Sequence, residues 1–235
     1  MQDNRKISIV IPNYNRTDLL IESFEKVYSD DRVSEIIVSD DFSEKSVYYE
    51  LMDLFELMPK VKMFRNQFNQ DCYMNKHTAM ELATNEFCIL ADSDNIFEPD
   101  YIDRVYSFPV WDKNTIYAPS FAKPTFNYTE YNGEVITKEN VSSFIDKPMF
   151  ETALNTSNFF INRSQYLKTW DGAVDPVTSD SIYFVYCWLN AGNKFHIVDG
   201  MEYFHRVHDD SHYKINVART PEGFHDSILN KLRQL

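Results

Sequence analysis

Short apolar runs alternate with amphipathic stretches over the first hundred residues of the chain. The apolar run Ile7 to Ile11 predicts a buried strand, which ends at Pro12 and the turn-forming residues after it. Apolar residues then recur at helical spacing, which predicts a helix capped by Thr17 or Asp18. The same alternation continues, with strands expected at 35–38, 61–64 and 87–91 and helices at 47–58 and 74–83.

This alternation indicates βαβ units and therefore a mostly parallel sheet that is covered by helices on both faces. In such sheets ligands bind at the carboxyl ends of the strands. Three polar groups follow predicted strands, at residues 13–16, 39–43 and 92–95. We therefore expect these three loops, which are distant in sequence, to lie together at one rim of the sheet.

Asp92 and Asp94 directly follow the fourth predicted strand. Residues two apart on a strand point to the same side, so the two carboxylates can converge on one hard cation or on a ribose hydroxyl. An Asp-x-Asp pattern also occurs in ordinary turns and helix caps. A calcium loop of the EF-hand type is excluded, because Ile96 and Phe97 stand where that loop needs an oxygen ligand and a glycine.

The second half of the chain has a weaker pattern. Residues 117–133 are rich in aromatic residues and Asn without a clear period, which favours a long loop or hairpin. Further on, the pattern predicts a strand at 158–162, a helix at 181–189 with Gly192 as its left-handed cap, and strands at 195–198 and 202–207.

The composition bounds the class of protein and its partners. A chain of 235 residues with 43% hydrophobic residues is long enough for one well-packed α/β domain. A net charge of −13 makes binding to nucleic acid or anionic membranes unfavourable. The same charge opposes any anionic nucleotide, which would need a divalent metal or well-placed Lys and Arg residues beside it.

Cysteine usage and the amino terminus indicate where the protein acts. The three cysteines are far apart in sequence, and two of them lie in apolar runs, which is typical of reduced thiols in a core. No apolar signal core begins the chain, and no apolar stretch approaches the ~20 residues that a membrane helix needs. The sequence therefore predicts a soluble, cytoplasmic protein without a transmembrane segment.

Five segments in order, from about residue 7 to residue 211, resemble the family 2 glycosyltransferases, nucleotide-sugar enzymes of the GT-A fold. These segments are Ser8-Ile-Val-Ile-Pro12-Asn-Tyr14-Asn-Arg16, Ile36-Ile-Val-Ser-Asp40-Asp41-Phe-Ser43, Asp92-Ser-Asp94-Asn-Ile-Phe-Glu-Pro99-Asp100, Trp170-Asp-Gly172 to Asp180, and Tyr203-Phe-His205-Arg206-Val-His208-Asp-Asp-Ser211. The resemblance implies an α/β, Rossmann-like fold in one domain spanning residues 1–235. Residues 1–100 would bind the nucleotide, and the less regular residues 101–235 would hold the acceptor and the catalytic group.

The resemblance also implies a binding site for a nucleotide sugar, most simply a UDP-sugar. A carboxylate can accept the ring N–H of uracil while Tyr14 stacks on the base. Phe42 stands where the family usually has Gly after the paired aspartates, and Lys76 stands where the family has a basic residue that meets the diphosphate. The residues implied to contact the donor are Pro12, Asn13, Tyr14, Arg16, Asp40, Asp41, Lys76, Asp92, Ser93 and Arg206.

For the chemistry, the resemblance implies a divalent metal, Mn²⁺ or Mg²⁺, with Asp94 and His208 as its ligands. Asp180 falls in the region where the family's Glu-Asp pair supplies the catalytic base, with Ser179 in place of the Glu. The expected reaction is an inverting transfer of one sugar to a hydroxyl of a glycan or other small acceptor. The Gln-x-x-Arg-Trp element of processive relatives is not found in the sequence.

Other interpretations of these residues remain open at the level of sequence. Asp40, Asp41 and Asp180 can each cap the helix that follows them, and a zinc cluster of His205, His208 and His212 lacks an obvious fourth ligand. A nucleotidyltransferase of sugar phosphates would share the architecture and the metal, but the loop after the first strand has no glycine to cradle a triphosphate. A binding module that has lost catalysis is the non-enzymatic alternative.

Overall fold

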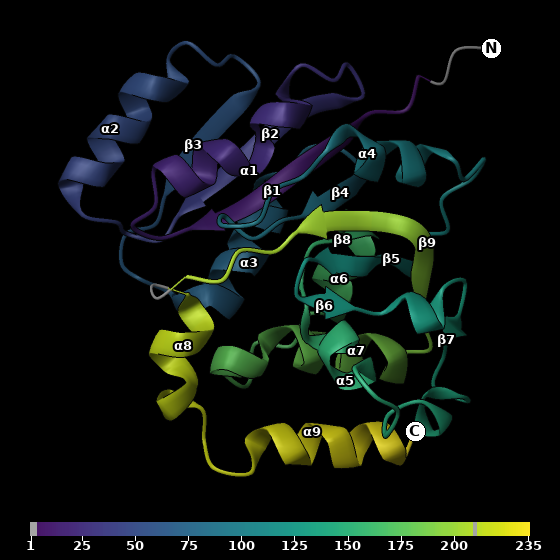
Figure 1. Cartoon of the computed structure of the whole chain (residues 1–235). Coiled ribbons are helices and arrows are strands. Elements are labelled where there is room, and N and C mark those ends of the chain that lie inside the picture. The colour runs from purple at the N-terminus through teal and green to yellow at the C-terminus, as the bar shows by residue number, and fades with distance from the viewer. Residues whose placement is uncertain (1–3, 209–210) are drawn as a thin grey trace.

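The computed structural model describes residues 4–208 and 211–235 and shows one mixed sheet flanked by helices on both faces (Figure 1). The strands are β1 (Ile7–Asn13), β2 (Val33–Asp40), β3 (Val61–Arg65), β4 (Phe87–Leu90), β5 (Thr115–Lys123), β6 (Phe126–Asn127), β7 (Val135–Ile136), β8 (Phe159–Asn162) and β9 (Lys194–Phe204). The α-helices are α1 (Asp18–Tyr28), α2 (Lys45–Phe55), α3 (Asp71–Leu82), α4 (Pro99–Tyr106), α5 (Phe150–Asn155), α6 (Arg163–Thr169), α7 (Asp180–Asn190), α8 (His212–Asn216) and α9 (Phe224–Arg233). Single turns of 3₁₀-helix include η2 (Val141–Ser143), η3 (Val177–Ser179) and η4 (Val217–Arg219).

The strands of the sheet lie in the order β3-β2-β1-β4-β8-β5-β9-β7, with β6 paired to β5. Strands β1 to β4 are mutually parallel, which confirms the βαβ units predicted for the first half. β8 runs antiparallel between β4 and β5, while β5 and β9 are parallel to each other. The strand order reverses at β1 and β4, and such a switch point leaves a crevice at the carboxyl ends of these two strands.

The parallel strands form the centre of the core because helices cover both of their faces. Every residue of β1 and of β4 is buried. These strands therefore lack the alternation of apolar and polar residues that a half-exposed strand shows. On the far side of the sheet the core is largely aromatic. Phe159 of β8 packs on Phe184 of α7, which contacts Trp188, while Phe160 packs on the other face against Phe87 and Trp111.

Of the long loop or hairpin predicted at 117–133, the structure forms a hairpin, because β5 pairs antiparallel with β6, and β5 itself is a strand of the sheet interior. β5 lies between β8 and β9 and is largely buried, so it lacks the alternation of a half-exposed strand. The two strands predicted at 195–198 and 202–207 are one strand, β9, in which Gly200 has a positive φ of 67°. Gly192 has a φ of 82°, which confirms the predicted left-handed cap after α7.

After β9 the C-terminal segment passes beside the Asp-x-Asp segment and then continues into α8 and α9 (Figure 1). Phe204 at the end of β9 forms an isolated bridge with Ile96, just after the Asp-x-Asp segment. α9 then packs against α7 and η2. Among the described residues, no helix is long and apolar enough to cross a membrane. Residues 1–3 of the predicted amino terminus, and residues 209 and 210 of the last motif, lie outside the described residues.

Candidate functional site

The three polar loops expected at one rim of the sheet do lie together. Asn13 pairs in register with Asp40, and the Asp41 N–H donates to the Asn13 carbonyl over 2.8 Å. The Ala91 N–H, at the start of the loop that carries Asp92, donates to the Val10 carbonyl over 2.9 Å. The parallel ladder therefore places all three loops at the crevice between β1 and β4, which confirms this part of the sequence prediction.

The loop after β1 reaches the Asp-x-Asp segment through Arg16. Its guanidinium donates to Ser93 Oγ over 2.9 Å and lies 3.0 Å from Asp94 Oδ2. Pro12 and Asn13 are buried beneath this loop, and the Asn13 side-chain amide donates to the Arg16 carbonyl over 3.1 Å. The loop is thus held in shape by its own polar groups before any ligand binds.

Tyr14 is 51% exposed and lines a cavity of about 560 Å³. Other rings line the same cavity, and the Arg65 guanidinium stacks over two of them, 4.3 Å from the centroid of Tyr48 and 5.1 Å from that of Phe42. The full lining is Tyr14, Phe42, Ser43, Glu44, Lys45, Tyr48, Tyr49 and Arg65. An aromatic wall with cations beside it can accept a flat, electron-rich ring.

Asp40 and Asp41 are both buried where β2 ends. Asp41 accepts hydrogen bonds from the Gln70 N–H at 2.8 Å and from Asn66 at 2.9 Å, yet burial raises the pKa of its carboxyl. The side chain of neither residue caps α2, whose N-cap is Glu44. Between this pair and α2, Phe42 has a φ of 63°, the left-handed conformation that explains why glycine is usual at this position.

Asp92 is held by Asn158 through two reciprocal hydrogen bonds. The Asp92 N–H donates to Asn158 Oδ1, and Asn158 Nδ2 donates to Asp92 Oδ2, both over 2.9 Å. Burial acts to raise the pKa of the Asp92 carboxyl, but the Lys76 ammonium, the Asn158 amide and Arg16 outweigh it and leave that pKa below its usual value. Sequence reasoning missed Asn158, which has a left-handed φ of 71° just before β8 and acts by holding Asp92.

Asp94 and His208 meet at the rim. His208 Nε2 lies 3.0 Å from Asp94 Oδ2, and both side chains are partly exposed. One carboxylate and one imidazole fit a divalent ion whose remaining positions are filled by ligand oxygens. Within residues 4–208 and 211–235, no group of three or more His, Cys, Asp or Glu side chains is placed to hold a metal by itself. A zinc cluster around His205 and His212 is therefore not formed by the described residues.

Arg206 does not reach toward Asp94 in this structure. Its guanidinium pairs with Glu22 of α1 over 2.7 Å, and its backbone N–H donates to Asn95 Oδ1 over 3.3 Å. Its predicted contact with a phosphate stays a prediction. Burial lowers the pKa of the neighbouring His205, whose ring packs on Phe126 with centroids 5.0 Å apart, so His205 is a packing residue here.

Asp180, the predicted base, is the first residue of α7 and is 8% exposed. The buried Lys76 ammonium of α3 lies 2.6 Å from Asp180 Oδ2 and 3.4 Å from Asp92 Oδ1. Burial acts to lower the pKa of Lys76, but the carboxylates of Asp180 and Asp92 raise it well above its usual value, so this lysine is charged. Its predicted contact with a diphosphate stays a prediction, and the structure gives it two carboxylate partners.

Ser179, which stands where a Glu was expected, contacts a histidine that sequence reasoning missed. Its hydroxyl lies 2.9 Å from Nδ1 of His225 on α9, and His225 Nε2 lies 2.6 Å from Glu151 of α5. The start of α7 is therefore tied to the last helix of the chain. No motif marked His225, because its partner lies 46 residues earlier.

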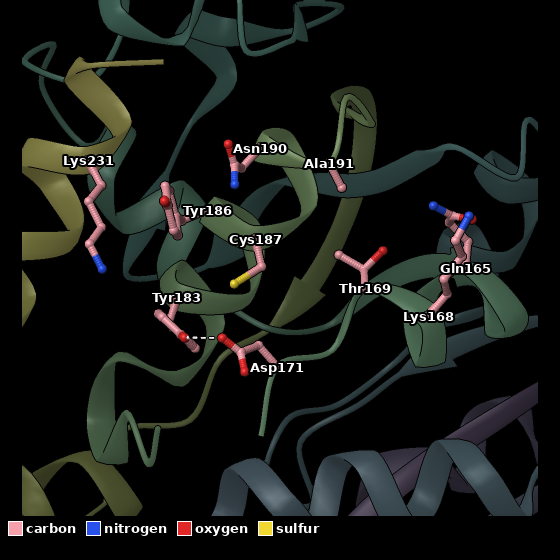
Figure 2. Close-up of a pocket in the computed structure, with 10 residues that line it drawn as sticks. All are labelled: Gln165, Lys168, Thr169, Asp171, Tyr183, Tyr186, Cys187, Asn190, Ala191 and Lys231. Carbon is pink, nitrogen blue, oxygen red and sulfur yellow. Dashed lines mark hydrogen bonds between the residues drawn. The ribbon is translucent and has the colours of Figure 1, made fainter. Parts of the chain in front are cut away.

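A second cavity of about 500 Å³ lies between α6, α7 and α9 and is separate from the site described above (Figure 2). Figure 2 shows Asp171 beside Tyr183, whose hydroxyl donates to it over 2.8 Å, and Lys231 facing them from α9. None of the residues predicted to bind the donor, the metal or the acceptor proton lines this cavity.

The family model described as "Glycosyl transferase family 2" matches residues 8–171 of the chain. The match includes the three loops at the rim and Lys76, while Asp180, Arg206 and His208 lie beyond it. A curated relative, the GalNAc(5)-diNAcBac-PP-undecaprenol beta-1,3-glucosyltransferase of Campylobacter jejuni, is 32% identical over 92 residues, which are 38% of this chain and 30% of the relative. The chain's matches span between 30% and 50% of the length of the curated relatives.

Solved structures resemble the chain over nearly its whole length. The structure of Staphylococcus aureus TarS residues 1–349 in complex with UDP-GlcNAc has a TM-score of 0.69 at 13% identity and covers 97% of this chain and 71% of that one. The mannosyltransferase PcManGT of Pyrobaculum calidifontis, in complex with GDP-Man and Mn²⁺, has a TM-score of 0.65 at 13% identity and covers 97% and 69%. At these identities the likeness shows the fold, which is the GT-A fold.

Proposed function

The chain belongs to glycosyl transferase family 2, and from this premise we propose that it transfers one sugar from a UDP-sugar to an acceptor hydroxyl, with inversion and with a divalent metal. The observation that carries the proposal is that Asp92 and Asp180 share the ammonium of Lys76, while Asp94, two residues after Asp92, lies 3.0 Å from His208. These residues come from separate segments, and only the fold brings them together.

The nucleotide would bind over the carboxyl ends of β1 and β2. Tyr14 is exposed beside the aromatic cavity and can stack on the base. The buried Asp41, whose pKa is raised, accepts hydrogen bonds readily and can read a ring N–H of uracil. One neighbouring structure contains UDP-GlcNAc and another contains GDP-Man, so the choice of uracil depends on this carboxylate.

The donor set at Asp94 and His208 fits Mn²⁺ or Mg²⁺, and a neighbouring structure contains Mn²⁺. When bound, the metal supplies positive charge against the departing diphosphate. Arg16 already holds Asp94 and can add its own charge to that end of the donor. The positive charges of the metal and Arg16 would offset the repulsion between an anionic ligand and a chain of net charge −13.

Asp180 would accept the proton of the acceptor hydroxyl as this hydroxyl attacks the anomeric carbon from the face opposite the diphosphate. A single displacement of this kind inverts the anomeric centre. The acceptor is a hydroxyl of a glycan or another small molecule, and the name of the Campylobacter jejuni relative favours a sugar on a polyprenyl diphosphate. The rival nucleotidyltransferase finds no support in the family match.

The experiment that tests the proposal measures UDP release from UDP-glucose with Mn²⁺ for the wild type and for Asp180→Asn. A base of this type contributes roughly 10²–10⁴ in rate, so turnover should fall by that factor while UDP still raises the melting temperature. Asp53→Asn on the exposed face of α2 is the matched control. A chelator should abolish wild-type release, and Mn²⁺ should restore it.

Three outcomes contradict parts of this proposal. If Asp180→Asn releases UDP as fast as the wild type, Asp180 is not the catalytic base. Activity that survives exhaustive chelation would show that transfer does not depend on a metal. UDP binding without release from any of a panel of UDP-sugars, with or without acceptor glycans, favours a binding module over an enzyme.

A further inference from the structure

Lys76 is buried in the middle of the site, with its ammonium group between two functional carboxylates. It is 5% exposed, and its Nζ donates to Asp180 Oδ2 over 2.6 Å and to Ser157 Oγ over 2.5 Å. The third neighbour is Asp92 Oδ1 at 3.4 Å. An ammonium group has three N–H donors, and this one has three oxygen partners in the protein.

These contacts oppose a role for Lys76 in binding phosphate. A buried charge is costly unless it is paired, and this lysine has two carboxylates and a hydroxyl around it. To reach a diphosphate its ammonium would have to leave at least one of these oxygens unpaired. The predicted phosphate role therefore competes with contacts that the fold already makes.

The same contacts constrain Asp180. Its Oδ2 atom accepts from Lys76, and among the described residues no hydrogen bond is made to its Oδ1 atom. The Ser157 hydroxyl lies 2.6 Å from the hydroxyl of Ser181, the next residue of α7. The lysine and this serine pair thus fix the first turn of α7 and the rotation of the Asp180 carboxylate.

We propose that Lys76 is a positioning residue for sugar transfer. It holds one oxygen of Asp180 so that the other is presented to the acceptor hydroxyl, and its contact with Asp92 sets the distance between the base and the carboxylate that faces the donor. This inference rests on the proposed function, because it takes Asp180 as the base. It differs from the phosphate role in acting on proton removal rather than on donor affinity.

The charged and titratable groups that face Asp180 come from several elements. Lys76 and Cys72 face it from α3, Tyr166 from α6, Asp92 from the loop after β4, and His212 from α8. Burial raises the pKa of the Cys72 thiol and lowers the pKa of His212, so both groups are neutral near pH 7. Lys76 therefore supplies the positive charge in contact with this carboxylate.

The test is a double-mutant cycle of Lys76→Met and Asp180→Asn, read by kcat for UDP release from UDP-glucose and by the Kd of UDP with Mn²⁺. We expect Lys76→Met to lower kcat by about 10²-fold, as misplacement of a catalytic group by about 1 Å does, and to change the Kd of UDP by less than about threefold. In the Asp180→Asn background the same change should add little further loss, because both act through one step.

Lys76→Arg guards against simple misfolding, because it keeps the charge while altering the geometry of the three contacts. We expect this variant to fold, to bind UDP and to lose about 10-fold or more in kcat. Lys194→Met, which removes an exposed lysine paired with Asp112, is the matched control.

The outcomes separate this inference from the function on which it rests. If Lys76→Met weakens UDP binding by 10-fold or more, or if its loss adds fully to that of Asp180→Asn, Lys76 acts on the donor and the inference is wrong. If Asp180→Asn alone keeps full turnover, the assignment of the base fails instead. A Lys76→Arg variant that folds and keeps wild-type kcat also overturns the positioning role.

Discussion

At the scale of single residues, Glu35 is a buried carboxylate outside the site that is fully paired. It accepts hydrogen bonds from Ser8 Oγ at 2.7 Å and from the Thr84 N–H at 2.6 Å, and Lys62 Nζ lies 2.7 Å away. Burial acts to raise the pKa of Glu35, but Lys62, Ser8 and Thr84 outweigh it and lower this pKa from 4.5 to about 2. The folded state therefore holds this carboxylate ionised where the unfolded chain would protonate it.

Glu35→Gln should make the free energy of unfolding less dependent on pH below about 4.5. Because the folded pKa lies below the unfolded one, the stabilisation by Glu35 is complete above the usual value of 4.5 and is lost as the pH falls toward 2. The unfolding free energy of the wild type should thus fall more steeply below pH 4.5 than that of Glu35→Gln, as measured by urea unfolding. Parallel curves for the two proteins would contradict the shift, and Glu56→Gln, at an exposed position, is the control.

Single residues of the site differ in how far the sequence could predict them. Asp92 and Asp94 have residue types and spacing that point to a shared ligand, His208 was implied by the family resemblance, and the structure brings Asp94 and His208 within 3.0 Å. Ser157 and Asn158 gave no such signal, because each acts by holding another side chain. Partners of this kind are set by packing, and no short pattern records them.

At the scale of elements, α6 shows how a helix start is fixed in the second half. Asn162, the last residue of β8, is the N-cap of α6, and its side-chain oxygen accepts from the Gln165 N–H over 3.0 Å. β8 and α6 thus join without a loop. This junction keeps β8 in register beside β4 and places Asn158 against Asp92.

Asn162→Ala should lower the unfolding free energy by about 1 kcal/mol, because one N–H of the first turn loses its cap. Asn162→Ser, which keeps an acceptor without placing a second carboxylate beside Glu86, should recover most of this loss. Chemical denaturation of the three proteins measures the effect. Equal stability of Asn162→Ala and the wild type would show that the cap has no energetic role.

Elements were predicted best where their apolar pattern was strong. The strands and helices of the first hundred residues were expected within a few residues of their observed bounds, because each βαβ unit repeats the same pattern. β5 was missed because a strand that is buried on both faces in a mixed sheet has no alternation to read. β9 was divided in two because Gly200 interrupts its pattern without ending the strand.

At the scale of the whole molecule, one sheet runs through both the first hundred residues and the rest of the chain. β8, from the second half, pairs directly with β4 of the first half. A parallel order of β1 to β4 could be predicted from the alternation, but the insertion of β8 between β4 and β5 depends on contacts between residues about 70 positions apart. The prediction of a single domain has not been tested.

A single domain should unfold in one cooperative transition. All three tryptophans, Trp111, Trp170 and Trp188, lie in the second half, whereas UDP is proposed to bind mainly to the first. Tryptophan fluorescence and far-ultraviolet circular dichroism should therefore give the same urea midpoint, and UDP with Mn²⁺ should shift both equally. If UDP leaves the urea midpoint measured by tryptophan fluorescence unchanged, the two halves unfold independently.

The ion pair between Lys76 of α3 and Asp180 of α7 crosses from one half of the chain to the other. It therefore limits which chimaeras between relatives can work. A hybrid that takes the half proposed to recognise the acceptor from another homologue needs an acidic residue at the start of α7, at the same distance from Lys76. New acceptor specificities should thus be easier to obtain by changing loops within the second half than by exchanging the half as a block.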